Sequence, residues 1–181
     1  MTHSIIFSGF GGQGVMLMGQ LLTQAGLHDG KKVSWIPSYG PEMRGGTAYC
    51  SVTISDDTIG SPIVTEPTLV VAMNLPSVTR FAPQVVPGGT LIINSSLSDE
   101  GGNRSDITEV RAPMNAIADE LKNPKVLNMV GLGVVLAAAK PVSEQAMLKA
   151  LDTMLGKKFA SKPHLLELNR TALKKGMEHV K

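Results

Sequence analysis

Cysteine is nearly absent from this chain of 181 residues, which contains only Cys50. A single thiol cannot form an internal disulfide. It cannot by itself hold an iron–sulfur cluster or a four-cysteine zinc ion either, because each needs several thiolates. Cys50 lies in the alternating pattern of residues 47–52, where we expect it to be a small buried hydrophobic residue.

Metal-binding and hydrolytic motifs are also missing. The four histidines have no acidic partner at a diagnostic spacing; they are His3, His28, His164 and His179. The chain has no H-E-x-x-H, no Walker lysine and no G-x-S-x-G. We therefore predict no metal site, and we identify no catalytic residue. The chain is not expected to be active alone.

Aromatic residues, net charge and long apolar runs are scarce as well. One Trp, two Tyr, four Phe and a net charge of +2 exclude the usual signature of a nucleic-acid-binding protein. The most apolar stretch, residues 126–139, is shorter than the roughly 20 residues of a membrane span, and it predicts a buried helix. No signal-peptide pattern opens the chain, so we expect a cytoplasmic protein without membrane contact.

What the chain does have is the composition of one globular domain. It is 43% hydrophobic and 18% charged, and residues 1–181 are long enough to enclose one substantial core. Basic residues gather in residues 157–181, where seven Lys or Arg stand against two Glu. This basic end is either a solvated helix face or a surface that docks to an acidic partner subunit.

Residues 9–14 read Gly-Phe-Gly-Gly-Gln-Gly, the G-x-G-x-x-G spacing of a phosphate-binding turn. The motif lies between the apolar run 5–7 and a helix-patterned stretch that begins at Val15. Glycine permits the positive φ angles of a sharp strand-to-helix turn and leaves N–H groups open to a phosphate at the helix N-terminus. The alternative is that the glycines only let the strand and helix approach closely. The predicted cofactor-binding residues are Gly9, Gly11, Gly12, Gln13 and Gly14.

A nicotinamide dinucleotide is disfavoured as the ligand of this turn. Such a site needs an acidic residue at the end of the second strand, where it holds the ribose hydroxyls. The second predicted strand, residues 32–36, ends in Pro37 and Ser38. The only acid nearby, Asp29, precedes that strand.

A second glycine-rich segment, residues 38–46, follows the same strand. Open α/β sheets bind ligands at the carboxyl ends of their strands, so we expect both segments to line one crevice. The arginine of this segment offers a planar fork of donors for phosphate or carboxylate. The alternative is a turn that its glycines and proline merely shape. The candidate binding residues are Tyr39, Glu42, Arg44, Gly45 and Gly46.

Apolar runs alternate with helix-patterned stretches along the chain. Strands are predicted at 4–8, 32–36, 47–55, 68–73, 89–94 and 107–111. Helices are predicted at 14–28, 75–86 with an interruption at Pro83, 113–121, 126–140, 143–155 and 163–178. This order favours a three-layer α/β fold with a mainly parallel sheet, a Rossmann-like glycine-rich first turn and a helical C-terminal third.

The two glycine-rich segments carry a resemblance. Residues 9–15 (Gly-Phe-Gly-Gly-Gln-Gly-Val) and 38–50 (Ser-Tyr-Gly-Pro-Glu-Met-Arg-Gly-Gly-Thr-Ala-Tyr-Cys) resemble the gamma subunit of 2-oxoacid:ferredoxin oxidoreductases. This family covers pyruvate, 2-oxoisovalerate and 2-oxoglutarate enzymes. The form of the second segment looks most like 2-oxoglutarate or broad 2-oxoacid members, and the resemblance extends over the whole chain.

The resemblance implies an enzyme that decarboxylates a 2-oxoacid on thiamine diphosphate, reduces ferredoxin through iron–sulfur clusters and releases an acyl-CoA. In that family the thiamine diphosphate, Mg and clusters belong chiefly to alpha, beta and delta subunits, and the single cysteine here agrees with this division. We expect no cofactor bound by this chain alone, with CoA as a substrate. The crevice would face CoA, thiamine diphosphate or only a partner subunit. The alternative function is a stand-alone nucleotide- or CoA-binding module.

Overall fold

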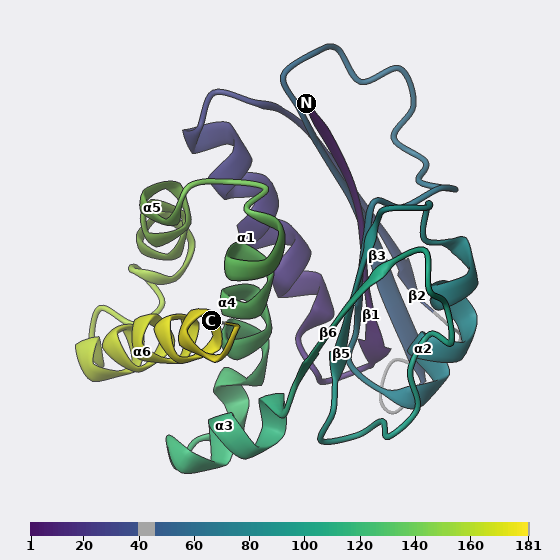
Figure 1. Cartoon of the computed structure of the whole chain (residues 1–181). Helices are drawn as coiled ribbons and strands as arrows, with labels where there is room; N and C mark the ends of the chain where they lie inside the picture. Colours follow the sequence, from purple (N-terminus) through teal and green to yellow (C-terminus); the bar gives the residue numbers. More distant parts are fainter. Residues whose placement is uncertain (40–45, 181) are drawn as a thin grey trace.

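A computed structural model describes residues 1–39 and 46–180. Its centre is a sheet of six strands in the order β2-β3-β1-β4-β5-β6 (Figure 1). The strands are β1 (Thr2–Phe10), β2 (Lys32–Tyr39), β3 (Thr47–Ser55), β4 (Leu69–Ala72), β5 (Thr90–Asn94) and β6 (Thr108–Ala112). The chain therefore places its first strand in the middle of the sheet.

Five of the six strands run in one direction. Strands β4, β5 and β6 continue the sheet from β1 in parallel, whereas β3 is antiparallel to both β1 and β2. The prediction of a mainly parallel sheet is confirmed. One consequence is that the carboxyl ends of β1 and β2 meet the amino end of β3 at the same edge. This edge is called the carboxyl edge below.

Helices cover both faces of the sheet, which confirms the three-layer prediction (Figure 1). The short helix α2 and the 3-10 turn η1 lie on one face, and the remaining helices lie on the other. Their bounds are α1 (Val15–His28), α2 (Leu75–Phe81), η1 (Ala82–Gln84), α3 (Met114–Glu120), η2 (Pro124–Val126), α4 (Leu127–Ala139), α5 (Glu144–Leu155) and α6 (Pro163–His179).

Two hydrophobic clusters fill the spaces between the layers. Alternation along β1 sends Ile5 and Phe7 into the cluster under α1 and α4, and Ile6 into the cluster under α2. Helix α1 comes very close to the sheet at Gly19, where an added Cβ would lie 2.5 Å from the Cys50 sulfur. Cys50 is fully buried, as predicted, and burial raises the pKa of its thiol to about 12.

Helix α4 is buried around most of its circumference, which confirms the prediction for residues 126–139. It contacts α6 backbone to backbone: a Cβ on Gly133 would lie 2.0 Å from the Leu173 carbonyl oxygen, and one on Gly176 would lie 2.0 Å from the Val130 oxygen. Glycine is required at both positions because any side chain would separate the helices. None of the described helices has the length and apolar character needed to cross a membrane.

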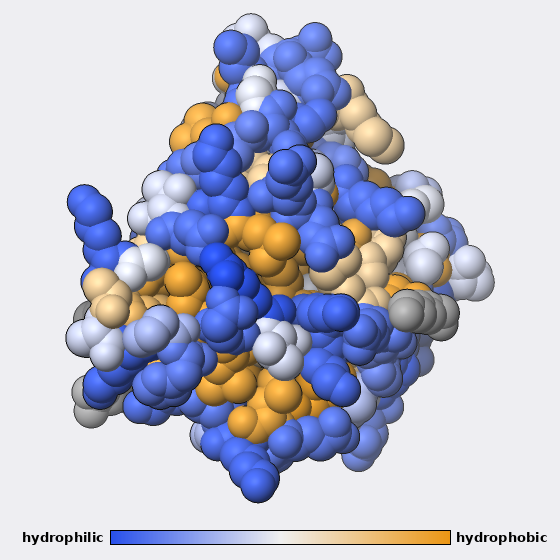
Figure 2. Space-filling model, turned by 90° about the vertical axis from the view of Figure 1, so that its left-hand side faces the viewer, coloured by the Kyte–Doolittle hydropathy of each residue, from blue (hydrophilic) through white to orange (hydrophobic). Residues whose placement is uncertain are grey.

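The outer helices present a mostly hydrophilic surface (Figure 2). Hydrophobic side chains emerge there only in separate patches between hydrophilic ones. Ion pairs contribute to this surface, where Arg170 of α6 bridges Asp152 of α5 and Glu167 of its own helix. The ion pairs are exposed, so each adds little to stability.

Strand β2 differs from the prediction for residues 32–36, because it continues through Pro37 to Tyr39. Pro37 stands opposite Cys50 of β3, and β2 has no neighbour on its other side. An edge strand tolerates proline because no second strand needs its N–H.

Candidate functional site

The glycine turn lies at the carboxyl edge, between the end of β1 and the start of α1. The two ends of the second glycine-rich segment, residues 38–46, lie at the same edge. Tyr39 pairs with Ala48 in the sheet, and the Gly11 N–H donates to the Gly46 carbonyl at 2.9 Å. The flanks of both segments therefore come together as expected. Glu42, Arg44 and Gly45 lie outside the described residues.

Glycine is needed at different positions of the turn for different structural reasons. Gly12 has a φ of 101°, is exposed, and a Cβ there would meet nothing within 4 Å. Gly14 has a φ of 79°, but a Cβ there would lie 2.6 Å from the Asn128 side-chain nitrogen. Gly9 is needed for close packing, since a Cβ would lie 2.6 Å from the Gln13 side-chain oxygen. Of the two turn glycines with a positive φ, Gly12 is the one with open space for a ligand.

The Gln13 side chain holds the turn in place from inside. Its oxygen accepts a hydrogen bond from the Phe10 N–H at 2.7 Å and another from the Asn74 amide at 3.2 Å. Its nitrogen donates to the Met73 carbonyl at 3.3 Å. The side-chain amide thus ties the end of β1 to the end of β4, and the Gln13 N–H donates to the Phe10 carbonyl at 3.1 Å. A ligand contact from Gln13 stays a prediction.

Two buried asparagines, absent from the sequence-based candidates, extend this network along the carboxyl edge. Asn74 follows β4 and caps α2, accepting from the Ser77 N–H at 3.0 Å. Asn94 ends β5 and donates to the Met73 carbonyl at 3.2 Å and the Asn115 oxygen at 2.8 Å. The signal that would have found them is an asparagine at the end of an apolar strand run, where backbone groups need partners.

A cavity of about 420 Å³ opens beside the turn. Its walls are the glycine turn, the first turns of α1 and the ends of β2 and β3. Tyr39, 55% exposed, stands at its border. The residues that line this cavity include Phe10, Gly12, Gly14, Met16, Gln20 and Tyr39.

This arrangement suits an anion. Among the described residues, the N–H groups of Gly12 and Gly14 have no hydrogen-bond partner, and the first turn of α1 carries no acidic side chain. The positive end of the helix dipole adds to the same field. In contrast, no group of three or more His, Cys, Asp or Glu that could hold a metal occurs in the described part of the chain.

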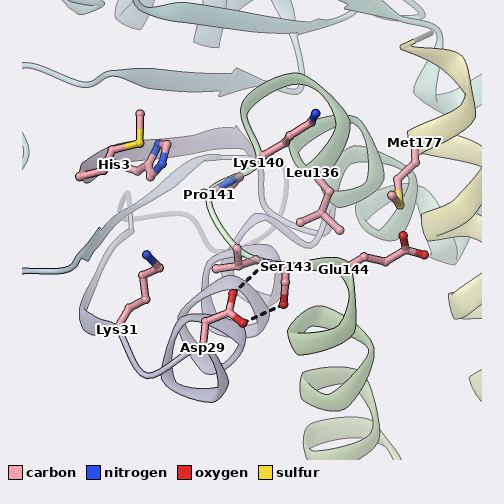
Figure 3. Close-up of a pocket in the computed structure, with 11 residues that line it drawn as sticks. His3, Asp29, Lys31, Leu136, Lys140, Pro141, Ser143, Glu144 and Met177 are labelled. Atoms are coloured by element: carbon pink, nitrogen blue, oxygen red, sulfur yellow. Dashed lines mark hydrogen bonds between the residues drawn. The ribbon is translucent and has the colours of Figure 1, made fainter.

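A second cavity, of about 460 Å³, lies at the opposite edge of the sheet, below the start of β1 (Figure 3). There the Asp29 carboxylate accepts hydrogen bonds from the Ser143 N–H at 2.6 Å and its hydroxyl at 2.7 Å. Lys31 pairs with Asp56 at 2.5 Å. Burial, with the charge of Lys31 nearby, lowers the pKa of His3. Asp29 and Lys31 therefore have partners, whereas Lys140 and Glu144, which also line the cavity, form no ion pair with the described residues.

Comparison with known proteins finds one family over nearly the whole chain. The sequence profile of the pyruvate ferredoxin/flavodoxin oxidoreductase family matches residues 4–179. The chain is 37% identical to the ketoisovalerate oxidoreductase subunit VorA of Methanothermobacter thermautotrophicus, over 94% of this chain but only 35% of VorA. It thus spans about a third of the length of that relative.

Other relatives have the length of this chain. It is 34% identical to the 2-oxoglutarate synthase subunit KorC of Methanocaldococcus jannaschii, over 100% of this chain and 95% of KorC. Among solved structures, the gamma subunit of a keto/oxoacid ferredoxin oxidoreductase from Geobacter sulfurreducens superimposes with a TM-score of 0.82 and 29% identity, over 98% of each chain. The α/β fold of the sheet and helices is therefore that of a known gamma subunit.

Proposed function

This chain belongs to the pyruvate ferredoxin/flavodoxin oxidoreductase family as a gamma-type chain, and on that premise we propose that it is the gamma subunit of a working 2-oxoacid:ferredoxin oxidoreductase. The complex would convert a 2-oxoacid and CoA into an acyl-CoA and CO₂, and the two electrons released would reduce ferredoxin. Alpha, beta and delta subunits would carry thiamine diphosphate, Mg and the clusters. We place the complex in the cytoplasm, where CoA is available.

For the substrate we favour 2-oxoglutarate. The Tyr-Gly-Pro-Glu-Met-Arg-Gly-Gly form of residues 39–46 supports this choice. So does the relative KorC, named as a 2-oxoglutarate synthase subunit, which this chain matches over nearly its full length. The relative VorA, named for ketoisovalerate, makes a branched 2-oxoacid the second candidate.

The contribution that we assign to this chain is an anion crevice for the diphosphate of CoA. One observation carries it: Gly12 is exposed, has a positive φ and has open space where a side chain would stand, at the N-terminus of α1. Gly30 and Gly88 share the positive φ and the open space, so it is the place of Gly12 at the N-terminus of α1, beside the cavity, that supports a bound phosphate. Arg44, placed here by the sequence alone, would add a fork of donors to the phosphates.

The first experiment is an anaerobic purification of the tagged chain from its native host. We expect alpha, beta and delta subunits to co-purify, and the complex to reduce a viologen dye in a CoA-dependent manner, fastest with 2-oxoglutarate. Pyruvate and 2-oxoisovalerate are the comparison substrates. A chain that purifies alone, without clusters or activity, would instead indicate the stand-alone nucleotide- or CoA-binding module.

The crevice itself is tested by paired glycine variants in the active complex. Gly12→Ala should raise the KM for CoA about tenfold, because the methyl group occupies the phosphate position. Gly30→Ala is the matched control, since Gly30 also has a positive φ of 71° and open space but lies at the far edge. Equal KM values in the two variants would remove the crevice from the proposal. An unchanged KM in Arg44→Ala would remove that arginine only.

A further inference from the structure

The two outer strands of the sheet, β2 and β6, are protected very differently. Strand β6 is short, and its charged residues are bound to the loop that precedes it. Glu109 accepts a hydrogen bond from the Gly102 N–H at 2.9 Å, and Arg111 donates to the Ser98 carbonyl at 2.7 Å. Short length, charged side chains and a bound loop are the usual means by which an outer strand avoids pairing with another chain.

Strand β2 lacks most of this protection. It has eight residues, of which Lys32 is the only charged one and none is fully buried. No strand lies along its outer side within residues 1–39 and 46–180. Alternate residues of such a strand turn their N–H and C=O groups away from the sheet. The protective feature that it does have is Pro37, which leaves residues 32–36 open to pairing with a further chain.

Hydrogen bonding is also incomplete in β2. Within the part of the chain that the structure describes, two buried side-chain polar atoms have no hydrogen-bond partner, the Ser34 hydroxyl oxygen and the Trp35 ring nitrogen. Both belong to β2, and because they are neighbours in a strand they lie on opposite faces of the sheet. Buried polar atoms are normally paired, so β2 is not fully satisfied in the isolated chain.

A hollow of about 250 Å³ lies beside β2. The residues that line it are Gln20, Thr23 and Gln24 of α1, Trp35 of β2 and Met154 of α5. None of these residues is charged. Aromatic residues and methionine are enriched at the centre of protein interfaces, where charged residues are depleted. The hollow therefore has the composition of an interface centre, with Trp35 as its largest side chain.

The surface along β2 continues into the crevice proposed for CoA. Gln20 lines both hollows, and Tyr39, which ends β2, borders the crevice. The function proposed above requires CoA to meet the acyl group that forms on thiamine diphosphate, so the subunit that holds this cofactor must face the crevice. The relative VorA supports a lasting contact, because the part that this chain matches is only 35% of that longer polypeptide.

We propose that the outer side of β2, with Trp35 at its centre, docks this chain to the subunit that holds thiamine diphosphate. An extended, uncharged segment of that subunit pairs with the backbone of residues 32–36 and covers the hollow. Pro37, which has no N–H to donate, ends the pairing. The identity of the partner rests on the function proposed above. The unprotected strand and its unpartnered atoms call by themselves for a covering chain.

Hydrogen exchange tests the docking surface without any substitution. It is measured by mass spectrometry on the full chain alone and on the purified complex. The outward-facing amides of residues 32–36 should exchange at least about tenfold more slowly in the complex, because the added strand accepts their hydrogen bonds. Residues 108–112 of β6 are the internal control and should exchange equally in both samples. Equal exchange of residues 32–36 in the two samples overturns the proposal.

A charge placed in the hollow tests the contact beside Trp35. When co-expressed with the unsubstituted chain, Thr23→Lys should enter the complex about tenfold less well, because the interface would bury its ammonium without a partner. Thr171→Lys in α6 is the matched control and should compete equally, since each threonine hydroxyl donates to the carbonyl four residues before it. Intact mass gives the ratio of the two chains in the complex. Equal incorporation of Thr23→Lys contradicts a contact at the hollow.

Cross-linking from Lys32, the only lysine of β2, identifies the partner. It should reach the subunit that binds thiamine diphosphate, and cross-links to other subunits alone overturn that choice. A complex that oxidises a 2-oxoacid while residues 32–36 stay unprotected overturns the docking surface and leaves the proposed function standing. If no other subunit co-purifies, that function fails. A homodimer with residues 32–36 protected then assigns the surface to a second copy, and a monomer shows that it needs no cover; both overturn the partner proposed here.

Discussion

The two edges of the sheet each carry a cavity, and the two cavities differ in the groups that line them. At the amino edge, the cavity of about 460 Å³ is lined by charged and polar side chains, among them Asp29 and Ser143, which bind each other. At the carboxyl edge, about 420 Å³ adjoin N–H groups of Gly12 and Gly14 that have no described partner. Free hydrogen-bonding capacity therefore distinguishes the candidate site better than volume does.

The largest effect should come from Gly14→Ala at the carboxyl edge. The new Cβ is strained by the positive φ and clashes with Asn128, so we expect the free energy of unfolding to fall by about 3–4 kcal/mol. Gly12→Ala carries the backbone strain alone and should cost only about 1 kcal/mol. Urea denaturation of both variants measures the difference. Equal losses would mean that the contact with Asn128 does not shape the turn.

The next effect concerns Gln13, whose side chain holds the glycine turn at the carboxyl edge. Gln13→Ala removes three hydrogen bonds and leaves the Phe10 N–H and the Met73 carbonyl with fewer partners. We expect a loss of about 2–3 kcal/mol in the free energy of unfolding, together with faster hydrogen exchange at Gly11 and Gly12. Gln20→Ala, an exposed glutamine in α1, is the control. Unchanged exchange at the turn would contradict an anchoring role.

At the amino edge the comparison predicts a loss of stability without a loss of function. Asp29→Ala removes the acceptor of the Ser143 N–H and hydroxyl, which joins the end of α1 to the start of α5. We expect the free energy of unfolding to fall by about 1–2 kcal/mol, while the KM for CoA stays unchanged. Asp57→Ala, on an exposed turn, should change neither quantity. A raised KM in Asp29→Ala would show that the edges are not independent.

The smallest effect is a pH dependence at the amino edge. Burial first, then the charges of Lys31 and the terminal ammonium, lower the pKa of His3, and Asp56 opposes this only in part. A lowered folded pKa means that the unfolded chain binds the proton more readily, so stability falls as the pH drops below 6.5. We expect the free energy of unfolding to decrease slightly between pH 7 and pH 5. His3→Gln should flatten this part of the profile, and an identical slope in both proteins would refute the assignment.

Local patterns identified most of the elements correctly. Residues 47–55 form the predicted strand, and Ser143 accepts from the Ala146 N–H as the N-cap of α5. The extra length of β2 was missed because proline ordinarily ends a strand, and only the position of β2 at the sheet edge makes Pro37 acceptable. The direction of β3 was missed as well, since alternation is the same in parallel and antiparallel strands.

For the candidate site, the sequence alone determined that a glycine-rich strand-to-helix turn exists and that a second glycine-rich segment follows the next strand along the chain, because glycine spacing and apolar runs are local properties. It could not separate Gly12, which is open, from Gly9 and Gly14, which are crowded by side chains far along the chain. It also could not bring the Gln13 side chain to Met73 and Asn74. Only the tertiary structure determines these contacts, since contacts between distant residues depend on how the helices pack against the sheet.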